Sequence, residues 1–398
     1  MNYLKKIQTT NNYNFINDTV FAQGSELKIC ENEIKKIDEI ISQIFSMKKI
    51  EDKKLNFLFS DLEIYSNIVF ENLLRINKEL YFQLFVEEIK RKYFESVNEI
   101  RVKLYKQNST QLFNKNDSLF KEGFYFGELK KKTVDSIIKI SEKYLNSFYE
   151  NIKKGKTNRN NLSINTGADI RKIIKLINFE FNQNGTNSSV SNYMQNRFEV
   201  IGCSLELSTE NSTWWKWDNQ KEISKHTLYA HVDENLFCPK SICYLSNVGK
   251  LNGPTSFYPN VINNLDLNFM QNIIGRTLNS IGSSKNSKLF KIYKKKSNRA
   301  YETKLFFEHI NKLPKNLKFD SHIGWYIKNN SFLERKFIDN EIVMKGEPGK
   351  FVVFDGSKVF HRGGCIDKGQ RLVLQLTFGE KINFFQKILR KIPRMLKK

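Results

Sequence analysis

The sequence predicts an α+β fold in which a helical N-terminal region precedes a small β-barrel. Between residues 26 and 108, apolar residues recur every three or four positions and prolines are absent, which is typical of amphipathic helices. Residues 371–378 instead alternate between a polar and an apolar face, as expected for a strand in the wall of a barrel. The apolar fraction of 40% is enough to build a core, which excludes global disorder.

The N-terminal part is expected to contain two regions. Residues 1–25 are polar and rich in asparagine, which predicts a disordered segment. Residues 26–115 are predicted to form a helical appendage, which packs on the barrel or mediates oligomerisation. We find no motif of a known chemistry in either region.

The barrel domain is expected to span residues 116–380. It begins with a largely helical stretch that ends near residue 180, and its first strand is predicted near residue 198, after a loop rich in Asn and Ser. The connection that follows Pro254 is roughly 100 residues long, which is too long for an unstructured loop inside a domain. We therefore expect a basic, helical insertion at about 262–345, of the kind that shapes a substrate pocket.

Two distant segments carry the candidate metal ligands. His231 and Asp233 are two positions apart, so on a strand both side chains point to the same face and can reach one metal ion. The surrounding residues 227–233 alternate in the same way, which predicts a strand. A second histidine, His361, lies far along the chain. Two histidines and one carboxylate are the ligand set of a facial-triad non-haem Fe(II) site.

An arginine lies ten residues beyond the second histidine, on the polar face of its strand. Because a buried guanidinium is costly without an anion to pair with, Arg371 predicts a bound dicarboxylate, and 2-oxoglutarate is the one that such an iron site uses. Gln375 and Thr377 share the face of Arg371, and Tyr229 shares the face of the triad. These three side chains are predicted as further contacts in the pocket.

Any one of these features could be structural, since isolated histidines and His-x-Asp pairs occur by chance. The joint pattern, which includes a Gly253–Pro254 loop, favours a metal site. The other histidines have no such context, and we expect His226, His309 and His322 to lie at the surface or in the packing. Arg362 points away from the site if its strand continues, so it is predicted to belong to the scaffold.

These segments resemble the phytanoyl-CoA dioxygenase-like family of Fe(II)/2-oxoglutarate-dependent oxygenases. The matching stretches are LYAHVDEN, CYLSNVGKLNGPTSFYPN, FHRGGCIDKGQRLVLQLTFG and the earlier LFKEGFYFGELKKKTVDSIIKISEKY. The resemblance therefore covers roughly residues 115–380, and it is specific in the triad and the HRGG segment and loose in between. It implies a double-stranded β-helix, or jelly-roll, core. It also implies iron bound by His231, Asp233 and His361, with the C5 carboxylate of 2-oxoglutarate bound by Arg371.

The resemblance also implies a reaction class, in which O2 and 2-oxoglutarate are consumed and succinate and CO2 are released. Relatives that halogenate replace the carboxylate ligand by a small residue, whereas Asp233 is present here, which favours hydroxylation. Nucleic-acid demethylases of the AlkB type carry a second arginine in the last strand. Residues 372–378 contain none, which disfavours that class.

The net charge of +23 is concentrated outside the helical appendage, since residues 1–116 contribute only +2. One basic cluster lies in the predicted insertion and comprises Lys285, Lys288, Lys291, Lys294, Lys295, Lys296 and Arg299. The other is the tail, residues 381–398, where apolar residues recur at helical spacing opposite the basic ones. This tail either contacts an anionic membrane surface or docks on the barrel. The cluster Trp214, Trp215 and Trp217 forms part of the core or the rim, or a platform for a sugar or lipid.

Location and partners follow from the remaining patterns. The chain has no apolar run long enough for a signal peptide or a membrane span, and its five cysteines show no disulfide or zinc spacing, so we expect a cytoplasmic protein, free or peripheral to the inner face of the membrane. The expected substrate is a lipid-linked saccharide, a lipid or a small metabolite. A non-catalytic jelly-roll that binds a ligand or partner is the alternative. Nucleic acid is disfavoured, because the basic clusters lack interleaved aromatic residues. The sequence does not indicate an oligomeric state.

Overall fold

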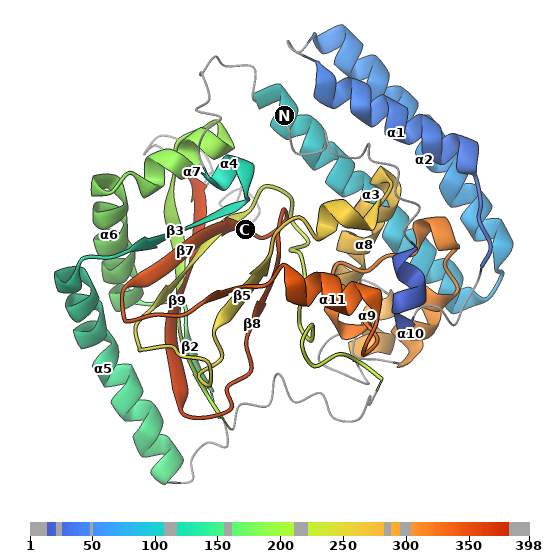
Figure 1. Cartoon of the computed structure of the whole chain (residues 1–398). Coiled ribbons are helices and arrows are strands. Elements are labelled where there is room, and N and C mark those ends of the chain that lie inside the picture. The colour runs from blue at the N-terminus through green and yellow to red at the C-terminus, as the bar shows by residue number, and fades with distance from the viewer. Residues whose placement is uncertain are drawn as a thin grey trace, which may run out of the picture.

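The structure is a computed structural model, and it describes residues 14–20, 26–47, 51–106, 118–154, 161–210, 222–281, 288–294 and 304–381. Two antiparallel sheets occupy the left and centre of Figure 1. Their strands are β1 (Phe124–Glu128), β2 (Asn161–Ile164), β3 (Phe198–Thr209), β4 (Pro239–Tyr244), β5 (Thr255–Tyr258), β6 (Ile342–Met344), β7 (Lys350–Asp355), β8 (Phe360–Gly363) and β9 (Gln370–Glu380). The larger sheet has the order β1-β7-β4-β9-β3-β2, and the smaller sheet has the order β6-β5-β8.

The strand pairing is that of a jelly roll. β3 pairs with β9, β4 with β7 and β5 with β6, and the short segment at His231 forms an isolated bridge with His361 in β8. If the His231 segment is counted as the second strand and β3 as the first, the first pairs with the last, the second with the next to last, and so on inwards. This nested antiparallel order is characteristic of the eight-stranded jelly roll. The predicted α+β jelly-roll core is confirmed.

The apolar face of β9 has the environment that its alternation predicted. Its leucines lie in an apolar cluster between the larger sheet and the helices α5 (Lys131–Lys153), α6 (Ala168–Gln183) and α7 (Thr186–Met194). Val373 instead belongs to a cluster that joins the two sheets, where the rings of Phe257 in β5 and Phe354 in β7 have centroids 5.1 Å apart. The inner face of the larger sheet therefore looks towards the smaller sheet, and its outer face is covered by helices.

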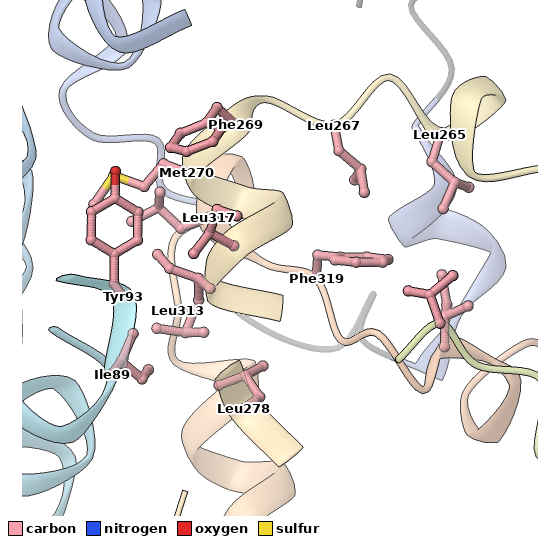
Figure 2. Packing of buried hydrophobic residues seen from close by; sticks show 14 of the residues in the cluster. Ile89, Tyr93, Leu265, Leu267, Phe269, Met270, Leu278, Leu313, Leu317 and Phe319 are labelled. Carbon is pink, nitrogen blue, oxygen red and sulfur yellow. The ribbon is translucent and has the colours of Figure 1, made fainter. Parts of the chain in front are cut away.

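The N-terminal helices are α1 (Glu31–Ser46), α2 (Asp52–Ile76) and α3 (Leu80–Lys106), and they lie to the right of the sheets in Figure 1. The helices inserted between β5 and β6 are α8 (Phe269–Thr277), α9 (Lys288–Lys294), α10 (Lys304–Asn311) and α11 (Phe332–Asp339). The N-terminal helices pack chiefly on α8, α9 and α10 of this insertion. Figure 2 shows this contact, with Tyr93 of α3 beside Phe269 and Met270 of α8. The helical appendage thus meets the barrel mainly through the insertion, with a direct contact in which Lys103 of α3 donates to the carbonyl of Leu236 at 2.7 Å.

The described residues of the insertion, predicted at about 262–345, include the helices α8 to α11. Residues Ile342–Met344 form β6, which pairs with β5 in the smaller sheet. The barrel therefore resumes directly after α11. A three-residue strand is too short for its alternation to be recognised beside a long helical segment.

The prediction that residues 1–25 are disordered is wrong for residues 14–20. Phe15–Asp18 form a short 3-10 helix in which Phe15 and Ile16 are buried, and the Phe15 ring packs edge-on against Phe319 at 5.9 Å. Thr19 forms a bridge with Ile327. Two apolar side chains in a polar context are a weak signal in sequence, yet the insertion offers a site that buries both.

Several predictions fall outside the described residues. They concern residues 1–13 and 21–25, the tail 382–398, the tryptophan cluster 214–217 and four of the seven basic residues in the insertion cluster. Within the described part of the chain, no helix has the length and apolar character needed to span a membrane.

Candidate metal centre

The two histidines of the predicted triad are brought together by a backbone bridge. The amide of His231 donates to the carbonyl of His361 at 3.0 Å, and the amide of His361 donates to the carbonyl of His231 at 2.9 Å. The centroids of the two imidazoles are 4.3 Å apart as a result. Residues 130 positions apart in the sequence thus lie side by side at the edge of the smaller sheet.

Asp233 is held against a glycine turn at the end of β7. Its amide donates to the carbonyl of Gly356 at 2.7 Å. A Cβ atom on Gly356 would lie 1.8 Å from Oδ2 of Asp233, so a residue with a side chain would displace the carboxylate. The buried carboxylate of Asp355 fixes this turn, since it accepts hydrogen bonds from the amide and hydroxyl of Ser357 at 2.9 and 2.7 Å and from the Tyr193 hydroxyl at 2.6 Å.

The three side chains converge on one point. Nε2 of His231 and Nε2 of His361 each lie 3.9 Å from Oδ1 of Asp233, and the ligand atoms of all three residues lie within 4.8 Å of one another. Ligands that are about 2 Å from one ion lie roughly 3 to 4 Å apart. The set therefore fits a metal after small side-chain rotations. No other group of His, Cys, Asp or Glu side chains in the described ranges converges in this way.

The ring tautomers suit metal binding. Nδ1 of His231 lies 2.8 Å from the carbonyl oxygen of Tyr229, and Nδ1 of His361 lies 3.1 Å from that of Val359. A carbonyl oxygen can only accept, so each Nδ1 carries the hydrogen and each neutral ring keeps its lone pair on Nε2. Such hydrogen bonds orient metal-binding histidines and raise their basicity as ligands.

The electrostatics favour neutral histidines beside an ionised carboxylate. Burial lowers the pKa of His231, and burial together with the neighbouring imidazole lowers the pKa of His361 to about 3. Burial alone would raise the pKa of Asp233, but its interactions with the His361 imidazole and with Lys240, whose Nζ is 2.6 Å from Oδ2, bring it below its usual value. These are the protonation states in which a metal is bound without first displacing protons.

Arg371 is buried, and its guanidinium is only partly hydrogen-bonded, as expected at an anion-binding site. The side chain is only 7% exposed, and Nη1 donates to the carbonyl oxygen of Gly253. Nε is buried and has no hydrogen-bond partner among the described residues, and burial lowers the pKa of the guanidinium. A carboxylate would satisfy the free donor and the charge together. This is the observation that fits the C5 carboxylate of 2-oxoglutarate.

The Gly253–Pro254 loop places the carbonyl that Arg371 contacts. Gly253 has a left-handed backbone, with φ +70°, and a Cβ there would lie 2.5 Å from the carbonyl oxygen of Gly364. The amide of Gly364 in turn donates to the carbonyl of Pro254 at 3.0 Å. Both glycines are needed for this close approach, which connects the loop to the segment after β8.

The strand predicted for residues 227–233 is wrong apart from the bridge at His231. Tyr229 has φ +68°, a left-handed conformation that breaks the alternation. The backbone forms turns instead, in which the amide of Ala230 donates to Thr227 and the amide of Gly324 donates to Ala230. A Cβ on Gly324 would lie 2.2 Å from the Thr227 carbonyl oxygen. The insertion therefore lies directly against the backbone of residues 227–230, and its contacts take the place of the hydrogen bonds of a β-strand.

The other three predicted pocket residues have different surroundings. Tyr229 is buried against Trp325, edge-on at 4.6 Å, and it touches the site through its carbonyl group. Gln375 and Thr377 are exposed on β9, and Nε2 of Gln375 donates to Glu206 at 2.6 Å. Contacts of these three side chains with a bound ligand stay predictions.

The remaining histidines are divided between packing and surface, as predicted. His309 is fully buried, His226 is exposed, and Arg362 belongs to the scaffold because it pairs with Glu341 at 3.3 Å. His322 does pack, but it packs on the site, since its ring stacks on His231 with centroids 4.7 Å apart. Neither His322 nor Lys240 has a motif spacing that could have placed it beside the triad.

Sequence comparison gives no relative, because no family model and no curated protein matches the chain. Solved structures that resemble it include the non-haem α-ketoglutarate-dependent carbocyclase SnoK from nogalamycin biosynthesis, at 10% identity and a TM-score of 0.34 over 68% of this chain and 85% of that chain. EctD from S. alaskensis, with 2-oxoglutarate and 5-hydroxyectoine, is 9% identical with a TM-score of 0.34, over 69% of this chain and 78% of that one.

HygX from Streptomyces hygroscopicus, with nickel and 2-oxoglutarate bound, is 10% identical with a TM-score of 0.33, over 68% of this chain and 88% of that chain. Because these TM-scores and identities are low, neither the fold nor the function of the chain is inferred from them. The fold rests on the strand pairing, and the metal centre rests on the geometry of its three ligands.

Proposed function

We propose that this protein is an Fe(II)- and 2-oxoglutarate-dependent dioxygenase that hydroxylates a C–H bond. The observation that carries the proposal is the convergence of His231, Asp233 and His361 at one edge of a jelly roll. A 2-His-1-carboxylate set with room for further ligands is the site of non-haem Fe(II) oxygenases. Bound Fe(II) would supply the oxidising chemistry, with succinate and CO2 formed from 2-oxoglutarate.

The residues of the chain would bind and orient the reactants. His231 and His361 would bind the metal through Nε2, because their Nδ1 hydrogens are engaged by backbone carbonyls. Asp233 would bind as the anion, and Lys240 at 2.6 Å from Oδ2 would hold that oxygen away from the metal. Monodentate binding of Asp233 would leave more positions for cosubstrate and O2.

Arg371 would anchor the cosubstrate. Its buried and incompletely paired guanidinium is matched to a carboxylate, and 2-oxoglutarate has one at each end. One end would bind the metal and the other would pair with Arg371, which fixes the orientation of the molecule. The resemblance to the phytanoyl-CoA dioxygenase-like family supports the same role for this residue.

The substrate we propose is a lipid-linked saccharide, a lipid or a small metabolite. The lipid part of this proposal is based on the basic, amphipathic sequence pattern of residues 381–398, which suits a contact with anionic lipid. Deletion of residues 382–398 tests the membrane part of this proposal. Sedimentation with phosphatidylserine-containing liposomes is expected to decrease in the deletion variant, and unchanged sedimentation would contradict it.

Uncoupled turnover tests the oxygenase itself. The purified protein, with Fe(II) and O2, should convert 2-oxoglutarate to succinate slowly without substrate, and His361→Ala should not. Arg371→Lys keeps the charge but loses the planar fork, so it should raise the KM for 2-oxoglutarate at least tenfold and leave Fe(II) binding intact. Equal rates with and without the triad would contradict the proposal. They would favour a non-catalytic jelly-roll that binds a ligand or partner.

A further inference from the structure

The insertion supplies one buried arginine to the backbone around the metal centre. Arg276 lies on α8 and is 3% exposed. Its Nη1 donates to the carbonyl oxygen of Asp233 at 2.8 Å, and its Nη2 donates to the carbonyl oxygen of Ser357 at 2.8 Å. One guanidinium thus joins the segment that carries the metal-binding carboxylate to the turn against which that carboxylate rests.

The contact is specific for arginine. The planar guanidinium presents its two terminal nitrogens at a fixed separation, so it sets the distance between the two carbonyl groups that it contacts. Nε of Arg276 donates to Oδ1 of Asn272 at 2.7 Å, one turn earlier on the same helix, which fixes the orientation of the fork. A lysine could reach one carbonyl but could not span both.

The position of Asp233 depends on the separation that Arg276 sets. Oδ2 of Asp233 lies so close to Gly356 that there is no room for a methyl group between them. Relative movement of residues 233 and 356–357 would therefore turn the carboxylate away from the histidines. Groups behind the ligands that orient them typically change metal affinity about 10- to 100-fold when they are removed.

The rest of α8 is fixed by the helical region of the protein. Figure 2 shows Phe269 and Met270 of α8 packed with Tyr93 of α3 and with Leu313 and Leu317 of the insertion. Gly275, next to Arg276, lies directly against Phe319, where a Cβ would be 2.2 Å from the ring. The helix that presents Arg276 is therefore held on several sides.

We propose that Arg276 is a positioning residue for the metal centre, which aligns the carboxylate of Asp233 through the backbone of residues 233 and 357. This inference rests on the proposed function, because it takes the triad as a metal site. It assigns a task to the insertion, since the residue that aligns a barrel ligand is supplied by an inserted helix.

Titration of the full-length, metal-free protein with Co(II) tests the inference, since its visible bands report the coordination geometry. Arg276→Met is expected to weaken Co(II) binding at least tenfold and to shift the bands, while Arg276→Lys recovers part of the affinity. Gln271→Leu is the matched control, since Gln271 is a buried residue of the same helix that donates to the carbonyl of Lys318 instead. Its affinity and spectrum should equal those of the wild type.

The outcomes separate the two claims. If the wild type binds no Co(II), or if His361→Ala binds it equally well, the proposed function fails and the inference fails with it. If the wild type binds through the triad but Arg276→Met binds with the same affinity and spectrum, the inference alone is overturned. If Arg276→Met does not fold, the same Co(II) titration of Arg276→Lys and Asn272→Ala tests the inference in its place. Unchanged affinity and spectrum in both would overturn the inference, and weaker binding with shifted bands would support it.

Discussion

Gly356 is the residue on which the Asp233 carboxylate depends most directly, because the two are in contact where a side chain would otherwise lie. Gly356→Ala would place a methyl group 1.8 Å from Oδ2 of Asp233. We expect metal affinity to fall about 10- to 100-fold, the range for lost orientation of a ligand. The measurement is a Co(II) titration. Gly249→Ala is the control, since its Cβ would lie at an ordinary 3.5 Å from Asn252, and equal losses in the two variants would refute the account.

At the scale of residues, the sequence predicts the ligands but not their surroundings. His231, Asp233 and His361 form a recognisable set because a metal restricts both residue type and order. His322 and Arg276 have no such restriction, since they reach the site from an insertion whose path depends on tertiary packing. Their spacing in the sequence therefore holds no information about the triad.

At the scale of elements, β9 and residues 227–233 show when alternation is a reliable guide. β9 is an 11-residue strand with a partner on each side, so its two faces have different neighbours along its length. Residues 227–233 alternate over a shorter stretch, and their backbone groups pair with the insertion at Ser321 and Gly324. A local period of two cannot reveal that competing contact.

The docking of α10 on α3 predicts an acid-sensitive contribution to stability. His309 of α10 is fully buried beside Phe82 and Phe85, with its Nδ1 2.7 Å from the Tyr293 hydroxyl. Burial lowers its pKa to about 4 from 6.5. Because the folded pKa is depressed, the contribution is fully present above pH 6.5 and is lost as the pH falls through 4.

His309→Gln keeps a polar partner for Tyr293 but does not titrate. Between pH 7.5 and pH 5, the wild type should lose about 2 kcal/mol more free energy of unfolding than the variant. Urea denaturation of the metal-free proteins at the two pH values measures the difference. Equal losses in the two proteins would show that His309 is not the group responsible.

At the scale of the whole molecule, one apolar cluster contains side chains of the N-terminal helices, the insertion and the segment around the triad, including Tyr229 and Val232. The appendage should therefore contribute to the stability of the site. Ile89→Ala on α3 removes a fully buried side chain and should cost about 2 to 4 kcal/mol. Ile64→Ala on α2, where the side chain is 54% exposed, should change stability by less than about 0.5 kcal/mol.

Urea denaturation followed by circular dichroism measures both variants. A small effect of Ile89→Ala would mean that the appendage folds independently of the insertion.

The packing of the N-terminal helices on the insertion could not be predicted in full from the sequence. Helical periodicity identifies the apolar faces of α1 to α3. The surface that covers these faces is formed by residues roughly 200 positions away in the sequence, and a local period does not predict distant packing partners.

The central claim is that His231, Asp233, His361 and Arg371 form one site for Fe(II) and 2-oxoglutarate. Anaerobic titration of the purified protein with both, followed by visible absorption, tests it most directly. We expect the charge-transfer band of the chelate in the wild type, no band in His231→Ala, and a band in Arg371→Ala that requires at least tenfold more 2-oxoglutarate. A folded wild-type protein that gives no band, or a His231→Ala variant that gives the full band, would contradict the account.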